Sequence, residues 1–300
     1  IAASLPFRGL MRACRPEQWA KNLLLALPLL AGHVWVEERW LAIVVGIAIF
    51  SAVASAVYLL NDALDAPHDR LHPRKRLRPI AAGEVSLMWA LRGIATLLAA
   101  AIAGLVWLGS PLFSLCVALY AITAVSYSLL WKRVFCLDLF VLVGLYLLRL
   151  FAGAALGEVA LSSWLLGVSF FFFLSLACMK RFASLKREAA SGAVHEPGRA
   201  YHVDDAAALG VVGIGSVFSV ALMLSLYLQS AAARTLYADP RYLFVIVPLM
   251  IFVLLRAWLL AYRGAVQDDP VAFFLRDRWS YFALGVTVTL AYFANLVWIL

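Results

Sequence analysis

The chain has 300 residues, of which 65% are hydrophobic and only 14% are charged, and its formal net charge is +8 at pH 7. This composition excludes an ordinary soluble globular protein and indicates a polytopic membrane protein. The basic residues form no stripe interleaved with aromatic residues of the kind that binds nucleic acid, so we expect no nucleic-acid partner.

Nine apolar windows are long enough to cross a bilayer as α-helices. They are residues 20–36, 40–60, 87–108, 111–131, 136–157, 161–179, 206–230, 242–262 and 279–300. The sequence therefore predicts an all-α protein with nine transmembrane helices, forming a single domain over residues 1–300 in a lipid bilayer.

Positive charge predicts the orientation of these windows. Nineteen of the 25 lysines and arginines lie in the N-terminal segment or in loops on the same side, three lie in the opposite loops and three within windows. Because cytoplasmic loops carry an excess of Lys and Arg, we expect a cytoplasmic N-terminus, an outside C-terminus and chemistry on the cytoplasmic side.

Three carboxylates follow the second window at spacings of three and four residues. They are Asp62, Asp65 and Asp69, preceded by Asn61. On an α-helix they fall within about 60° of one another, and carboxylates on one face repel unless a cation lies among them. Oxygen ligands suit Mg²⁺, so we expect a magnesium site here, although a solvated acidic loop is an alternative. Pro67 is expected to kink or end the helix, placing Asp69 beyond a break.

A basic run begins within this block. It comprises Arg70, Arg74, Lys75, Arg76 and Arg78. Such a density of cations fits the binding of phosphate groups. The alternative is a loop that only orients the protein in the membrane.

Polar residues near the other windows are further candidates. Lys21 and Asn22 either anchor the first window at the interface or contact a phosphate. Asp138 and Arg149 lie about three turns apart in the fifth window, where ionisable groups mark a functional site or a structural ion pair. The pair Lys180 and Arg181 is either a positive-inside anchor or a phosphate clamp. Tyr127 and Lys132 stand at the cytoplasmic end of the fourth window.

With nine windows, the motif Asn61-Asp62-x-x-Asp65-x-x-x-Asp69 resembles the UbiA-type intramembrane prenyltransferase superfamily. The common second motif, Asp-x-x-x-Asp, is reduced here to Asp138 with Leu142 four residues on. The opening Arg15-Pro16-x-Gln18-Trp19-x-Lys21-Asn22, the run from His72 to Ile80 and Lys180-Arg181 are instead similar to the decaprenyl-phosphate phosphoribosyltransferase branch.

The resemblance implies a UbiA-like bundle around a cavity open to the cytoplasm, in a bacterial inner membrane. It implies a Mg²⁺-dependent glycosyltransferase (pentosyltransferase) that moves 5-phosphoribose from phosphoribosyl pyrophosphate to a polyprenyl phosphate of the decaprenyl type. One alternative is transfer of a prenyl group from its diphosphate to an aromatic acceptor. Another is a non-enzymatic lipid carrier or flippase, which would explain the nine spans but not the carboxylate cluster. A homo-oligomer is left open. Some members carry an upstream phosphatase-like domain, which agrees with a chain that begins at Ile1.

The site expected from the motifs and the resemblance has two sets of residues. The catalytic and metal-binding residues are Asp62, Asp65 and Asp69. The substrate-binding residues are Lys21, Asn22, Asn61, Arg74, Lys75, Arg78, Tyr127, Lys132, Asp138, Arg149, Lys180 and Arg181.

Overall fold

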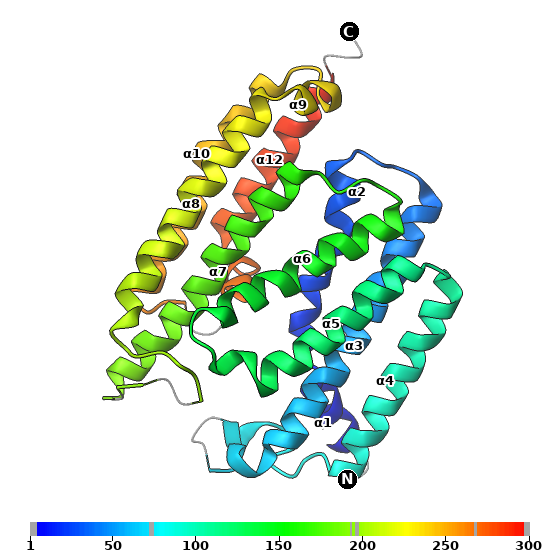
Figure 1. Cartoon of the computed structure of the whole chain (residues 1–300), viewed down its shortest axis with the longest axis vertical. Helices are drawn as coiled ribbons and strands as arrows, with labels where there is room; N and C mark the ends of the chain where they lie inside the picture. Colours follow the sequence, from blue (N-terminus) through cyan, green and yellow to red (C-terminus); the bar gives the residue numbers. More distant parts are fainter. Residues whose placement is uncertain (1–4, 72–74, 193, 196–197, 267–268, 297–300) are drawn as a thin grey trace. The chain divides into compact units, whose positions relative to one another are not determined.

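The computed structural model describes residues 5–71, 75–192, 194–195, 198–266 and 269–296, and the regular structure within these ranges is helical apart from one isolated antiparallel bridge (Figure 1). The elements are α1 (Leu5–Ala13), η1 (Pro16–Ala26), α2 (Leu27–Ala31), α3 (Glu37–Asp69), η2 (Lys75–Leu77), α4 (Leu87–Leu108), α5 (Pro111–Leu129), η3 (Trp131–Arg133), α6 (Leu137–Gly157), α7 (Ser163–Ala190), α8 (Asp205–Gln229), α9 (Ala231–Leu236), η4 (Pro240–Val245), α10 (Ile246–Tyr262), α11 (Pro270–Phe274) and α12 (Arg278–Leu296).

Seven helical segments among the described residues are long and apolar enough to cross a membrane, judged by length and composition. They are α3, α4, α5, α6, α7, α8 and the continuous segment of η4 with α10. The chain is thus a multi-pass membrane protein, but the predicted number of nine spans is not confirmed. The ninth window corresponds to α12, which is not among the seven spanning segments. The last four residues of that window, 297–300, lie outside the described part of the chain.

The first predicted window does not form one α-helix. Instead, the 3₁₀ helix η1 is followed by the short helix α2, which has Pro28 in its first turn. Pro28 has no N–H, and its ring would collide with the carbonyl of Leu24 inside a continuous α-helix.

Side chains spaced three residues apart explain the 3₁₀ form of η1. Trp19 Nε1 donates to Ser55 Oγ (3.0 Å), and Asn22 Nδ2 donates to Ser51 Oγ (2.9 Å). Three residues of a 3₁₀ helix and four residues of an α-helix both advance about 6 Å. Positions 19 and 22 of η1 therefore stay in register with positions 55 and 51 of α3.

Helix α3 corrects a second expectation, because it continues through Pro67 to Asp69. Pro67 lies only two residues before the end of the helix, so its missing N–H removes one hydrogen bond and interrupts no further turns. All three carboxylates therefore belong to one 33-residue helix that extends beyond the predicted window.

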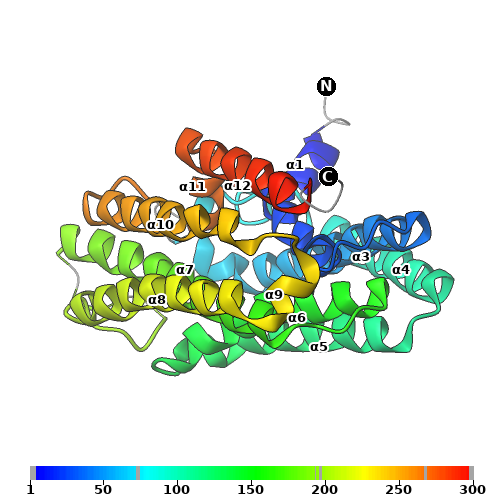
Figure 2. The same cartoon turned by 90° about the horizontal axis from the view of Figure 1, so that it is seen from above.

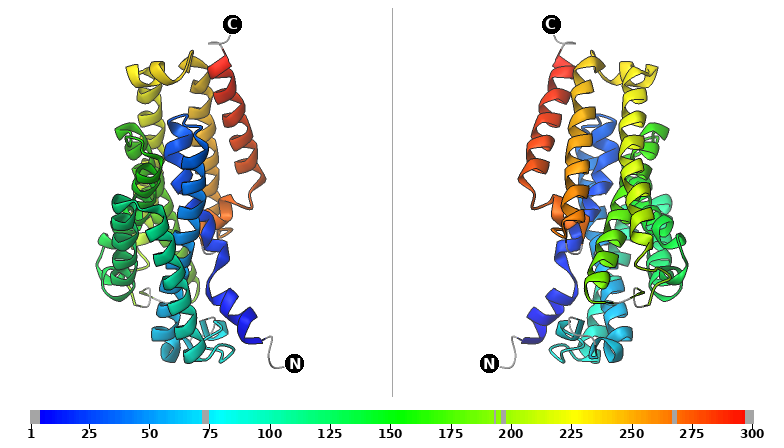
Figure 3. Two further views of the ribbon diagram at one scale, coloured as in Figure 1. Left: turned by 90° about the vertical axis from the view of Figure 1, so that its right-hand side faces the viewer. Right: turned by 90° about the vertical axis from the view of Figure 1, so that its left-hand side faces the viewer.

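The chain divides into two compact units, and the first contains residues 1–130 and 148–160. Within it, α3 packs against η1, α4 and α5, and α3 and α4 lie side by side (Figures 1 and 3). The C-terminal half of α6 approaches η1 closely at Gly153, where an added Cβ would lie 2.0 Å from the carbonyl oxygen of Leu25. Only glycine fits this approach.

The second unit contains residues 131–147 and 161–300. Helices α7, α8 and α10 pack on one another, as seen in Figure 2, and α12 runs along α10 (Figure 3). The fully buried Trp258 of α10 fits over Gly213 of α8 and donates from Nε1 to Ser175 Oγ of α7 (2.9 Å). The N-terminal half of α6 packs on α7 through the stacked rings of Tyr146 and Phe173, whose centroids are 4.5 Å apart.

Candidate functional site

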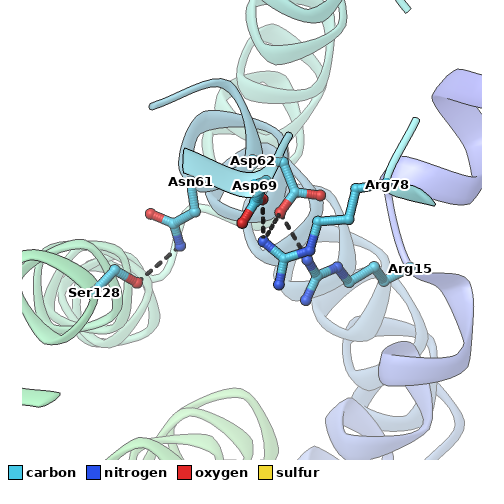
Figure 4. A network of polar contacts seen from close by, with 6 residues as sticks. All are labelled: Arg15, Asn61, Asp62, Asp69, Arg78 and Ser128. Atoms are coloured by element: carbon cyan, nitrogen blue, oxygen red, sulfur yellow. Dashed lines mark hydrogen bonds and ion pairs between the residues drawn. The ribbon is translucent and has the colours of Figure 1, made fainter. Parts of the chain in front are cut away.

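Four residues of the first unit form what we call the α3 carboxylate cluster: Asp62, Asp69, Arg15 and Arg78. Arg15 Nη2 lies 2.7 Å from Asp62 Oδ1. Arg78 Nη1 lies 2.7 Å from Asp69 Oδ2 and 3.3 Å from Asp62 Oδ1, so one nitrogen bridges both carboxylates. The two guanidinium groups approach from the same side (Figure 4). The cluster thus joins the predicted acidic face and the predicted basic run.

Arg15 enters the cluster through an uncommon backbone conformation. Its φ of 53° and ψ of 61° lie in the left-handed region, immediately before Pro16 begins η1. Residues other than glycine adopt this region at a cost of about 1 kcal/mol or more, so surrounding contacts must hold it. The guanidinium lies over the ring of Tyr58, 4.7 Å from its centroid, and bonds to Asp62.

An open cavity of about 620 Å³ adjoins the cluster. Its lining includes Arg12, Arg15, Gln18, Asp62 and Arg78, contributed by α1, η1, α3 and the segment after η2. The side chains of Arg15 and Arg78 are each 28% exposed, whereas Asp62 is only 3% exposed. Within the cluster the guanidinium groups are therefore more accessible from the cavity than the carboxylate of Asp62, although the exposed Glu17 also lines the cavity.

Asn61 and Asp65 complete the predicted acidic block. Asn61 Nδ2 donates to Ser128 Oγ of α5 (2.8 Å), pointing away from the arginines (Figure 4). Asp65 is half-buried and forms no hydrogen bond or ion pair within the described ranges.

The donor set of this block fits Mg²⁺ chemically, because it offers carboxylate and amide oxygens and no sulfur or imidazole. In the described part of the chain, however, no three His, Cys, Asp or Glu side chains are already arranged to hold a metal ion. Two of the carboxylates are instead paired with arginines. The magnesium site remains a prediction.

A second polar group in the first unit surrounds Arg149, which is buried. Its Nε donates to Asn22 Oδ1 (2.9 Å), and its Nη2 donates to Tyr120 OH (3.1 Å). Asn22 is fully buried and in turn donates to Ser51. Two residues predicted to bind substrate, Asn22 and Arg149, are therefore hydrogen-bonded to each other across 127 positions.

In the second unit, Asp138, Arg181, Arg199 and Tyr201 form the Asp138 cluster. Arg181 Nη2 donates to Asp138 Oδ2 (2.6 Å), Arg199 Nη1 lies 3.7 Å from the same oxygen, and Tyr201 OH donates to Oδ1. Burial and the hydrogen bond to Asp138 raise the pKa of Tyr201 above the ordinary tyrosine value, so the hydroxyl keeps its proton. Arg181, predicted as a phosphate ligand, is only 2% exposed.

The remaining predicted residues are placed as follows. Lys21 is half-buried in η1, Lys75 is exposed in η2, and Lys132 is half-buried in η3. Tyr127 is half-buried near the C-terminal end of α5, and Lys180 is half-buried within α7. Arg74 lies outside the described residues.

Sequence reasoning missed the partners that complete these clusters. The opening motif contains Arg15 but does not predict its pairing with Asp62. The sequence makes Arg199 and Tyr201, in the loop after the sixth window, only weak candidates, and no pattern indicates Tyr120 or Ser51. The only sequence feature that could have indicated a role for Arg15 is the number of arginines near the carboxylate motif. Tyr201 lies 63 positions from Asp138, and no local pattern joins them.

Helices of membrane-spanning length, together with carboxylate and arginine side chains paired beside an open cavity, define a multi-pass membrane protein with a charged candidate site. A comparison with protein families matches residues 23–297 to the UbiA prenyltransferase family, and the chain belongs to that family. The fold agrees, because a solved UbiA homologue from Archaeoglobus fulgidus, bound to GPP and Mg²⁺, superposes with a TM-score of 0.68 at 16% identity, over 94% of this chain and 99% of that one.

Several curated relatives are at least 30% identical. The y4nM protein of Sinorhizobium fredii is 34% identical over 96% of this chain, which spans only 56% of that protein's length. The nodulation protein NoeC of Azorhizobium caulinodans is 31% identical over 92% of this chain and 90% of its own. Decaprenyl-phosphate phosphoribosyltransferase of Mycobacterium tuberculosis is 31% identical over 90% of this chain and 88% of its own.

Proposed function

We propose that the protein transfers 5-phosphoribose from phosphoribosyl pyrophosphate to a polyprenyl phosphate and releases diphosphate. The observation that carries the release of diphosphate is the α3 carboxylate cluster with its cavity, where a carboxylate pair suited to Mg²⁺ is surrounded by arginines. The relatives named decaprenyl-phosphate phosphoribosyltransferase support the choice of substrates.

The residues have distinct roles in this reaction. Asp62, Asp65 and Asp69, assisted by Asn61, would hold Mg²⁺, which neutralises the charge of a departing diphosphate when it is bound. Arg15 and Arg78 would bind the diphosphate oxygens once the carboxylates engage the metal. Lys21, Lys75, Lys132 and Lys180 remain candidate contacts for the other phosphate groups, as does Arg74.

The bond changes balance without a further reactant. The bond between C1 of the ribose and the diphosphate oxygen breaks, and the electron pair leaves with the diphosphate. An oxygen of the lipid phosphate forms the new bond to C1, which passes through an oxocarbenium-like state. A phosphate is already anionic at pH 7, so the reaction needs no general base.

The setting is part of the same proposal. The resemblance implies a bacterial inner membrane, and the distribution of positive charge supports an N-terminus and a substrate cavity on its cytoplasmic side. Residues 1–300 would act as one catalytic domain, alone or as a homo-oligomer.

Transfer of a prenyl group from its diphosphate to an aromatic acceptor is the second candidate. The family's description and the solved homologue bound to GPP favour it. Both reactions use a metal and a diphosphate, so the cluster alone does not separate them.

Radiolabelled substrates separate the two reactions. The purified chain in detergent is incubated with Mg²⁺, phosphoribosyl pyrophosphate labelled in the ribose and a polyprenyl phosphate. We expect label in the lipid extract, its loss on addition of EDTA and its return with excess Mg²⁺. Product made from a prenyl diphosphate and an aromatic acid, with none from the labelled sugar, would establish the second candidate. Full activity in EDTA would exclude the metal.

A further inference from the structure

The first unit also contains an apolar groove, which is distinct from the cavity beside the α3 carboxylate cluster. Its volume is about 510 Å³, and most of its lining comes from α3, with further residues from η1 and with Leu97 from α4. Two lining residues, Leu23 and Val44, are 59% and 61% exposed, so the groove is open at the surface. Because α3 is a membrane-spanning segment, we expect this opening to face the acyl chains of the bilayer.

The lining of the apolar groove suits a hydrocarbon chain. None of the described lining residues is charged, and the polar side-chain groups are the indole of Trp19 and the hydroxyl of Ser51. Trp19 Nε1 donates to Ser55 Oγ, while Ser51 Oγ accepts from Asn22 and donates to the carbonyl of Ile47 (2.7 Å). Both groups are therefore satisfied within the protein, and an apolar occupant would leave neither of them unpaired.

One face of η1 leads from the cavity to the apolar groove. A 3₁₀ helix repeats every three residues, so Glu17, Ala20 and Leu23 lie on the same face. Glu17 lines the cavity, whereas Ala20 and Leu23 line the groove. The two sites adjoin at the next step of the chain as well, because Gln18 lines the cavity and Trp19 lines the groove.

Helix α3 places the two sites in the same order along its axis. Asp62 lines the cavity, and the groove residues of α3 lie between Val44 and Ala52. At 1.5 Å per residue, the groove begins about 15 Å from Asp62 and continues along α3 for about a further 12 Å. A molecule with an anionic head at the α3 carboxylate cluster and a long apolar chain can therefore place part of that chain in the groove.

We propose that the apolar groove binds the isoprenoid chain of the polyprenyl phosphate, with the phosphate in the cavity and the remainder of the chain in the bilayer. The identity of this lipid as the acceptor rests on the proposed function. The other candidate occupant is an acyl chain of a bilayer phospholipid, which is unbranched, and the experiments separate the two.

Photolabelling identifies the occupant without turnover. The purified chain in detergent is irradiated with a polyprenyl phosphate that carries a diazirine within its isoprenoid chain, and the labelled residues are located by mass spectrometry of tryptic peptides. We expect label at Leu23 and among residues 44–52. Excess unlabelled polyprenyl phosphate should remove this label, whereas dioleoyl phosphatidic acid, a phosphate lipid with unbranched chains, should not. Equal competition by the two lipids, or label confined to other residues, would overturn the proposal.

A side chain that fills the groove should weaken only the lipid substrate. Ala48 is exposed and lines the groove, so Ala48→Phe adds a ring there without entering the core. The isoprenoid chain moves from one apolar environment to another, so the groove contributes packing contacts rather than a hydrophobic gain. We expect Ala48→Phe to raise the KM for the polyprenyl phosphate by roughly five-fold or more and to leave the KM for phosphoribosyl pyrophosphate unchanged.

The matched control is Ala99→Phe, which adds the same ring at an exposed position of α4 that does not line the groove. It should change neither KM, and it should keep the photolabel that Ala48→Phe loses. The same KM for the polyprenyl phosphate in the two variants would show that its chain does not occupy the groove. Photolabelling of the parent chain needs no variant, so it decides the question if Ala48→Phe does not fold.

The two proposals can fail separately. If the parent chain makes no product from phosphoribosyl pyrophosphate, the proposed function is rejected, while label in the groove that only the polyprenyl phosphate removes would still establish an isoprenoid site. If product forms but the groove takes no label, the proposed function stands and the assignment of the groove is wrong.

Discussion

Arg78 links the two carboxylates that are candidates for metal binding, since its Nη1 contacts both Asp62 and Asp69. A guanidinium in this position competes with a divalent cation for the same oxygens and also offers donors to a phosphate. Removing it should therefore change the affinities for cation and anion in opposite directions.

We accordingly predict that Arg78→Gln lowers the Mg²⁺ concentration needed for half-maximal activity and raises the KM for phosphoribosyl pyrophosphate roughly ten-fold or more. Kinetics over a Mg²⁺ series measure both quantities. Arg8→Gln, an exposed site on α1, is the control. Unchanged values of both quantities in Arg78→Gln would contradict the role assigned to Arg78.

Asp65 offers the sharpest test of the metal site, because within the described residues it has no partner whose loss could disturb the fold. We expect Asp65→Asn, of nearly the same volume, to lower turnover by roughly 100-fold or more and to leave the unfolding temperature unchanged. Glu84→Gln, at a surface pair with Arg12, should keep full activity. A fully active Asp65→Asn would remove Asp65 from the metal ligands.

At this scale the sequence predicted the kinds of side chain but not their pairings. The spacing of Asp62, Asp65 and Asp69 placed them on one helical face, and the basic run supplied Arg78. Arg15 was not predicted to pair with Asp62, because the pair spans 47 positions and depends on a left-handed backbone at Arg15. The order of residues along the chain shows neither this long-range contact nor the backbone conformation of Arg15.

Among the elements, α6 offers a matched pair of glycines. An added Cβ at Gly153 would lie 2.0 Å from Leu25 O, whereas at Gly144 it would meet nothing within 4 Å. Alanine favours a helix over glycine by about 1 kcal/mol, so the intrinsic gain is the same at both sites.

Gly144→Ala should therefore maintain or raise the unfolding temperature in detergent. Gly153→Ala should lower it, because forcing η1 away from α6 costs about 1–3 kcal/mol, as overpacking typically does. The two curves, recorded under identical conditions, make the comparison. Equal unfolding temperatures would show that the close approach at Gly153 is not maintained in solution.

The helix boundaries were predictable for four of the nine apolar windows, which match α4, α5, α6 and α8 to within two residues. Apolar windows do not predict the type or length of a helix where contacts with other helices determine it. Segment 16–26 is a 3₁₀ helix because Trp19 and Asn22 follow the spacing of Ser55 and Ser51 on another helix. Helix α3 extends beyond the predicted window 40–60 because polar residues can continue a helix, whereas a hydropathy window ends where the apolar residues end.

For the whole molecule, the uneven distribution of Lys and Arg predicts which loops face the cytoplasm. Ala82 and Ala160 are both exposed and lie in loops predicted to be on opposite sides. With the exposed Cys136 replaced by Ser, an impermeant thiol reagent applied to intact cells should label Ala160→Cys but not Ala82→Cys. The reverse labelling pattern would invert the topology.

The length of α3 connects the carboxylate cluster to the membrane itself. At 1.5 Å per residue, its 33 residues extend about 50 Å, well beyond a hydrocarbon core of about 30 Å. Near its start, Trp35 and Trp40 stack with centroids 5.8 Å apart, an aromatic pair suited to the headgroup region. Because one stiff rod joins this anchor to Asp62 and Asp69, the height of the carboxylates above the acyl chains depends on hydrophobic thickness. The length of the bilayer's acyl chains is therefore expected to change where Asp62 and Asp69 lie relative to the membrane surface.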